Sequence, residues 1–246
     1  MKGTIFAIAI VIALCDIAGA QTFGVVYDSP NLDQGSALSI LSVTGGYKID
    51  AGHDAVCALK LAGPGTVFGN PLIGVSKNYG KEFLKSAFVA FSFPVVSEKN
   101  DVALRAFAAS QASDIVGYAP DAFTLSIRFD GKAETKTGIA LEIGVGAVEV
   151  MGAGKIEGDH FETYVPYSFG LSRPFSGRLA AFAELRGSWH ATAQGSFLER
   201  NFNEIGAGLR YKVLGIHVDG GVSVPVESNS RPILEETIHA KLWFEL

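Results

Sequence analysis

Two pairs of side chains have the types and the spacing that nucleophilic or acid–base catalysis could use. Ser188 and His190 are two residues apart, and so are His217 and Asp219. Residues i and i+2 of a β-strand point to the same face, so the members of each pair could act together. Neither pair has a third group nearby in sequence that would orient the histidine, and such pairs arise readily by chance. We therefore expect no enzymatic activity, and keep a hydrolase as the least favoured alternative.

A third polar group could touch a metal ion. His53 and Asp54 follow closely after Asp50 in a segment that reads as a turn. Two or three exposed polar residues in a turn are usually only solvated, whereas a metal site needs a closed set of ligands. The sequence therefore predicts no metal site and no cofactor.

Charged and histidine side chains recur at alternate positions, which would gather them on one face of neighbouring strands. In a confined interior such charges are costly unless they are paired or hydrated, so they imply either a water-filled pore or a network of ion pairs. The near balance of acidic and basic groups argues against a simple filter for anions or cations. The inward set comprises eleven candidates for lining a lumen, Arg105, Arg128, Glu142, Glu162, Glu184, Arg186, Glu204, Arg210, His217, Asp219 and Lys241, and a further four, Lys60, Arg178, His239 and Glu245.

The elements that would position these residues are β-strands, because apolar residues alternate with small or polar ones in segment after segment. Five earlier segments are less regular, and together the segments predict twelve strands. The regular segments are 123–129, 138–147, 164–172, 178–186, 204–211, 216–224 and 238–246, and the less regular ones are 36–49, 54–62, 66–76, 83–95 and 102–110.

The strands favour a membrane barrel over a soluble β-sandwich, which remains the alternative fold. The polar face is rich in Gly, Ala and Ser, which fit a confined lumen, and several segments run nine to thirteen residues, as a tilted membrane strand requires. We therefore predict an all-β, transmembrane, antiparallel up-and-down β-barrel of about 12 strands, with 10 to 14 as the range.

The connections alternate in length, as in barrels with short periplasmic turns and longer outer loops. With an even number of strands, both termini would be periplasmic. Tyr47, Phe83 and Phe123 would then lie near outer ends of strands, and Phe129 and Tyr211 near periplasmic ends. The expected short connections are 63–65, 97–101, 130–134, 174–177 and 213–215, and the longer ones are 111–120, 152–159, 191–202 and 227–235.

The N-terminus predicts export. Residues 1–20 contain Lys2, an apolar run and a small-residue site before Gln21, the layout of a cleaved signal peptide. Residues 21–34 lack a clean period and predict a periplasmic lead or a segment tucked into the lumen, which leaves 35–246 for the barrel. No apolar stretch after the signal peptide reaches the ~18 residues of a membrane helix. The net charge of −5, with scattered basic residues, argues against nucleic acid as a partner.

The C-terminal segment, residues 238–246, resembles the closing strand by which outer-membrane barrels are recognised for assembly. Leu242, Phe244 and Leu246 hold the alternate apolar positions, although the last residue is Leu where Phe is usual. The resemblance implies the barrel-assembly machinery and outer-membrane lipid as partners.

Three further segments, 69–75, 91–94 and 205–211, resemble the transporter barrels assigned to a phenol-degradation (MetA) pathway. That resemblance implies uptake of small organic molecules. We therefore predict a passive channel in the bacterial outer membrane for small polar or amphipathic organic solutes. A closed barrel with a structural or surface-interaction role is the alternative.

Overall fold

A computed structural model describes residues 22–32, 36–63, 67–80, 83–97, 99–110, 115–152, 161–193, 200–213, 216–226 and 234–245. The expected signal peptide and Leu246 lie outside these residues. Among the described residues, no helix has the length and apolarity that crossing a bilayer would take.

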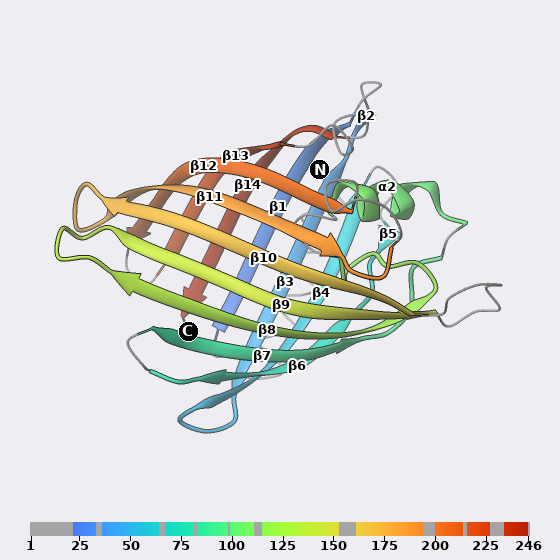
Figure 1. Ribbon diagram of the computed structural model, residues 1–246, viewed down its shortest axis with the longest axis horizontal. Helices are drawn as coiled ribbons and strands as arrows, with labels where there is room; N and C mark the ends of the chain where they lie inside the picture. Colours follow the sequence, from blue (N-terminus) through green and yellow to red (C-terminus); the bar gives the residue numbers. More distant parts are fainter. Residues whose placement is uncertain are drawn as a thin grey trace.

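Fourteen strands form one antiparallel sheet, in which β2 (Ser36–Ala37) and β5 (Val67–Phe68) have only two residues each. The other twelve follow one another in chain order, and β14 pairs with β1 to close the barrel (Figure 1). The predicted twelve-strand antiparallel barrel is confirmed. The wall strands are β1 (Thr22–Leu32), β3 (Ser39–Lys48), β4 (His53–Gly63), β6 (Leu72–Asn78), β7 (Leu84–Ser92), β8 (Ala122–Glu134), β9 (Ala140–Gly152), β10 (Phe161–Pro174), β11 (Leu179–His190), β12 (Asn201–Val213), β13 (Ile216–Pro225) and β14 (Leu234–Glu245).

The first wall strand lies where the sequence predicted a lead or a lumen segment, so that prediction is wrong for residues 22–32. β1 forms eleven register pairs with β14 and also pairs with β3. Pro30 has no N–H to donate, but it lies beyond the last β1–β3 pair, Asp28↔Ile40, where that donor is not needed. The turn-forming residues around Pro30 hid the strand from sequence reasoning.

The predicted strand 102–110 is instead the helix α2 (Asp101–Ala109). The Asn100 side chain caps it by accepting hydrogen bonds from the amides of Val102 at 3.1 Å and Ala103 at 3.2 Å. Its buried residues are alanines spaced by three, which a helix places on one face. Arg105 is therefore on a helix and not on a wall strand, contrary to its expected position.

The outer face of the barrel carries large exposed apolar side chains, as a surface in contact with lipid should. They alternate along the strands with residues that point into the lumen. Outward side chains that are more than a third exposed include Ile73, Val75, Val89, Leu125, Ile127, Phe129, Val145, Phe169, Leu171, Ile205, Leu209, Val218, Val222, Ile238 and Leu242.

The two ends of the barrel differ. One end, which we call the termini end, carries the first and last described residues, Thr22 and Glu245, and the short described turns 49–52, 135–139 and 175–178. The opposite end, which we call the loop end, carries the described residues of the insertion 93–121, with α2 (Figure 1).

Because β1 precedes them, β3, β4, β6 and β7 run opposite to the directions expected from the sequence. Tyr47 and Phe83 therefore lie at the termini end, not the opposite end as predicted, and the connections 63–65 and 97–101 belong to the loop end. The helix replaces a strand, so the directions from β8 onward are as predicted.

Glycines in the wall allow close approach of neighbouring backbone and of aromatic rings, and Gly208 has the closest backbone neighbour. A Cβ there would meet the Gly220 carbonyl oxygen at 2.1 Å and the Phe182 ring at 2.7 Å. We expect Gly208→Ala to lower the free energy of unfolding by about 1–3 kcal/mol, because backbone must move to make room. Urea unfolding in detergent would measure it. Gly170→Ala is the matched control, since its Cβ would meet nothing closer than 3.6 Å; equal losses in the two variants would contradict the explanation.

Candidate functional site

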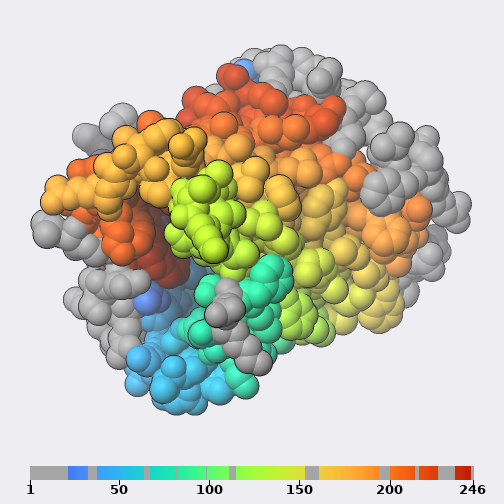
Figure 2. Space-filling view, turned by 60° about the vertical axis from the view of Figure 1, so that its left-hand side comes forward, coloured from blue at the N-terminus to red at the C-terminus, as the bar shows by residue number. Residues whose placement is uncertain are grey.

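The lumen contains three cavities between its middle and the termini end. Their volumes are about 330, 480 and 470 Å³, and Arg210 and Lys241 line all three. Figure 2 shows a recess at this end, with β1 and β14 set back behind the turns. We call this connected space the vestibule.

Ion pairs line the vestibule, two between neighbouring strands and one, Arg210 of β12 with Glu142 of β9, between strands that are not neighbours. The Arg210 guanidinium lies 3.0 Å from Glu142 and 3.1 Å from Asp219. The Lys132 ammonium lies 3.6 Å from the same Glu142 carboxylate. These groups stay about a fifth to less than half exposed, so water shares in stabilising them and each pair contributes modestly.

Arg128 is held on the same wall, where it donates to Asp130 at 2.8 Å and to Ser168 at 2.9 Å. The described carboxylates of the vestibule are therefore matched to basic groups, as the near balance of charges predicted.

A more deeply buried network lies at mid-barrel, around Arg186. Its guanidinium donates to the Glu204 carboxylate at 2.9 Å and lies 3.8 Å from Glu184. The Glu204 side chain is only 3% exposed. Arg186 also donates to Ser223 at 3.2 Å and contacts His239. A buried carboxylate of this kind is tolerated only because a guanidinium neutralises it.

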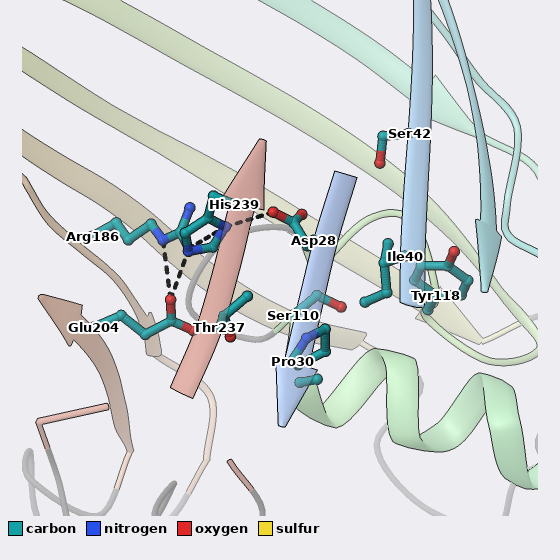
Figure 3. Close-up of a pocket in the computed structure, with 11 residues that line it drawn as sticks. Asp28, Pro30, Ile40, Ser42, Ser110, Tyr118, Arg186, Glu204, Thr237 and His239 are labelled. Atoms are coloured by element: carbon teal, nitrogen blue, oxygen red, sulfur yellow. Dashed lines mark hydrogen bonds and ion pairs between the residues drawn. The ribbon is translucent and has the colours of Figure 1, made fainter. Parts of the chain in front are cut away.

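The network extends across the seam where the barrel closes. His239 on β14 contacts the Asp28 carboxylate on β1 through Nδ1 at 2.5 Å (Figure 3). The His239 Nε2 atom lies 2.7 Å from the Ser223 hydroxyl. Side chains from four wall strands, β1, β11, β12 and β14, thus converge in Figure 3 beside α2.

Ser223, His239 and Asp28 have the connectivity of a nucleophile, base and orienting acid. The environment argues against that role. The Ser223 hydroxyl also donates to Glu204 at 2.8 Å and accepts from Arg186, and the residue is 1% exposed. A nucleophile needs an open approach for its substrate, so we interpret this chain of contacts as structural.

The loop end of the lumen is filled. In each wall strand at least one inward side chain between the mid-barrel network and this end is buried, with Glu204 and Ser223 of the network counted among them. Representative residues, one per wall strand, are Leu32, Ile40, Ala62, Leu72, Ser92, Thr124, Val148, Tyr164, Ser188, Glu204, Ser223 and Thr237.

The insertion 93–121 supplies much of the filling, and we call α2 with residues 115–119 the plug. The alanine face of α2 packs against Leu32, Ile40 and Ala62 from β1, β3 and β4. Residues 115–119 pack against inward side chains of β6 to β10, such as Leu72 and Val148. The plug therefore reaches across the lumen from one wall toward another.

Asn70 anchors the plug. Its side chain is fully buried, donates to the Ala119 carbonyl at 2.7 Å, and accepts from the amides of Val95 at 2.8 Å and Val96 at 3.0 Å. The Asn70 amide also donates to the Gly117 carbonyl at 2.7 Å. One residue thus binds both ends of the segment that carries α2.

Tyr118 of the plug faces the mid-barrel network across a cavity of about 20 Å³ that Asp28 and His239 also line. Burial, with the charge of Asp28 nearby, raises the pKa of the Tyr118 phenol. The phenol therefore stays neutral, and the plug adds no charge here.

Nine of the eleven lumen candidates lie beside these cavities, and their role in transport stays a prediction. Glu162 lies outside the cavities at the loop end, where its carboxylate accepts from Tyr164 at 2.8 Å, and Arg105 is on α2. The nine are Arg128, Glu142, Glu184, Arg186, Glu204, Arg210, His217, Asp219 and Lys241.

The side chains of the two pairs considered for catalysis are buried or engaged in other contacts. Ser188 is fully buried, and the His190 ring stacks on Tyr164 with centroids 4.2 Å apart. The Asp219 carboxylate is bound by Arg210.

The residues near Asp50 form a turn at the termini end. The Asp50 carboxylate accepts from the Gly52 amide at 2.7 Å and lies 2.9 Å from the His53 ring. The Gly52 amide, followed by the His53 ring, lowers the pKa of this carboxyl. These contacts hold the Asp50 carboxylate within the turn.

Sequence reasoning missed Asp28 and Asn70. Asp28 was assigned to a lead or a lumen segment. Asn70 was placed within the predicted strand 66–76, and its hydrogen-bond partners are 25 to 49 residues away. Leu242 and Phe244 lie on the outer face of β14, where Phe244 packs on Phe23, but their recognition during assembly stays a prediction.

No protein-family model matches the chain, and no curated protein resembles it in sequence. Solved structures resemble it in fold. An outer-membrane channel from Pseudomonas putida F1 aligns with a TM-score of 0.61 at 10% identity, covering 92% of this chain and 95% of that one. The NanC porin aligns with a TM-score of 0.57 at 8% identity, covering 92% and 99%. The fold is that of bacterial outer-membrane β-barrels.

LpxR from Salmonella typhimurium shares this outer-membrane barrel fold, with a TM-score of 0.51 at 8% identity over 92% of this chain and all of that one. At such identities the likeness concerns the fold alone, because one barrel can carry unrelated functions.

Proposed function

We propose that the protein is a passive outer-membrane channel for small polar or amphipathic organic solutes, closed at its loop end in the state described here. The observation that carries the proposal is the vestibule, whose charged groups remain partly exposed to a space of several hundred cubic ångströms. A barrel whose charges served only to hold it together would bury them, as the mid-barrel network does. The likeness in fold to a channel and a porin supports the same function.

In this proposal both termini face the periplasm, solute passes without cofactor or chemical change, and the plug controls passage. A closed barrel with a structural role is the second candidate. The pairing of the described vestibule carboxylates with basic groups favours it.

Planar-bilayer recording on residues 21–246, refolded in detergent, distinguishes a channel from a closed structural barrel. We expect discrete conductance steps. In Lys241→Met the ion selectivity of the channel should shift toward cations, because that change removes a positive charge from the pathway. Lys77→Met, on the outer face, is the control. A folded barrel that stays silent, both as the parent protein and with the plug anchor Asn70 replaced by Ala, would contradict a channel.

A further inference from the structure

We propose that the β12–β14 side of the vestibule is a binding site for a small organic carboxylate that carries a ring. The inference rests on the proposed function and names the class of solute that this wall would hold. The cavity concerned has a volume of about 330 Å³ and is lined by Arg210, His217, Asp219, Lys241 and Trp243. This volume is at the low end for small-molecule sites, which span about 300–1,000 Å³, so the ligand is small.

The charges of this wall favour an anion. Asp219 is the cross-strand partner of Lys241, but its carboxylate is directed to Arg210, which it meets at 3.1 Å. Among the described residues, no carboxylate lies within 4 Å of the Lys241 ammonium, which instead lies 5.8 Å from the centre of the Trp243 ring. Lys212, the cross-strand partner of His217, adds a second ammonium toward the rim. A ligand carboxylate can therefore meet Lys241 without breaking an existing ion pair.

The aromatic component of the site is Trp243, which lies along the wall. Its six-membered ring rests against Gly24 of β1, where a Cβ would stand 2.4 Å from the ring. A residue larger than glycine at this position would push the indole into the cavity. The remaining surface of the indole lines the cavity beside Lys241. An apolar ring can pack there while its carboxylate reaches the ammonium, because aromatic rings prefer offset or edge contacts with one another.

Its position in the barrel makes the site accessible from the termini end. The site lies at the termini end, on the open side of the plug. Arg210 and Lys241 also line the two larger cavities, so a bound anion would lie at the junction of all three.

The fluorescence of Trp243 tests the proposal directly. The chain has two tryptophans, and Trp189→Phe leaves Trp243 as the only one. We expect this variant, refolded in detergent, to show a saturable change in emission with sodium benzoate, and none with neutral benzyl alcohol or cationic benzylamine at equal concentration. No saturable change with benzoate, or an equal response to benzyl alcohol, would overturn the proposal. This comparison of ligands uses only the Trp189→Phe variant, so it does not depend on the folding of a protein in which a lysine is replaced.

A second variant tests whether the Lys241 ammonium is the charge that binds the carboxylate. Added to Trp189→Phe, Lys241→Met should weaken benzoate binding about tenfold or more, since a charged hydrogen bond contributes about 1.5–3 kcal/mol. Lys77→Met is the matched control, because Lys77 also lies over an aromatic ring, that of Tyr79 at 5.4 Å, but on the outer face of the barrel. Unchanged affinity in a folded Lys241→Met protein would contradict the site.

The binding test and the conductance test can fail independently of each other. Benzoate binding to a barrel that never conducts would contradict the channel and leave the site standing. Conductance without any response of Trp243 to benzoate would overturn only the site.

Discussion

Arg186→Met is expected to lower the free energy of unfolding by about 3–5 kcal/mol, because it leaves the buried Glu204 carboxylate without its cation. Glu204 is 3% exposed at its side chain and Arg186 is 19% exposed, so solvent cannot replace the lost guanidinium. Methionine keeps most of the side-chain volume, which limits the loss of packing. Urea unfolding of the refolded barrel, followed by the gel-mobility difference between folded and heated protein, would measure the change.

Arg128→Met is the matched control for this experiment. The Arg128–Asp130 pair is 38% and 39% exposed, and an exposed pair contributes about 0–1 kcal/mol. A double variant, Arg186→Met with Glu204→Gln, should recover part of the stability by removing one uncompensated charge. Equal losses from Arg186→Met and Arg128→Met would show that burial does not set the strength of these pairs.

Asn70→Ala is expected to have the largest effect on conductance. It removes the three hydrogen bonds that join the Asn70 side chain to Val95, Val96 and Ala119, and it leaves the buried Val96 amide without its acceptor, at about 1–3 kcal/mol for that group. Since about 1.4 kcal/mol corresponds to a tenfold change in an equilibrium, the fraction of time spent open should rise tenfold or more. Single-channel recording would measure the open fraction at fixed voltage.

Asn78→Ala is the control for the anchor, because its amide makes an exposed hydrogen bond to Asp54 at 2.9 Å, away from the plug. It should leave the open fraction unchanged. If Asn70→Ala folds and its open fraction equals that of the parent protein, the plug is not the element that closes the lumen.

The alternation from residue 123 onward predicted β8 to β14 and the direction of their side chains, because neighbouring barrel strands share one simple pattern of inward and outward positions. It therefore predicted that Arg210, Asp219 and Lys241 would share a lumen. The total of twelve strands was also correct, but through two errors that compensate: β1 was missed, and α2 was taken for a strand.

The predictions that failed concern residues whose positions depend on contacts distant in sequence. Asp28 lies in a turn-like run, and only its pairing with β14 and β3 makes it part of the wall. The buried alanines of α2 are spaced by three, which suits a helix and not a strand, and the position of the helix inside the lumen buries them. The role of Asn70 depends on a loop that folds back over it, which no local pattern indicates.

The seam between β1 and β14 has a consequence for how the chain acquires its fold. His239 and Asp28 meet across 211 residues of sequence, so this contact gains nothing until the eleven other pairings of wall strands have brought the two ends together. A chain shortened at either end would form hairpins but could not close, and its last strand would present an unsatisfied edge. Ring closure is then a late, all-or-none event, in which the hydrogen bonds of the seam and the Asp28–His239 contact form together.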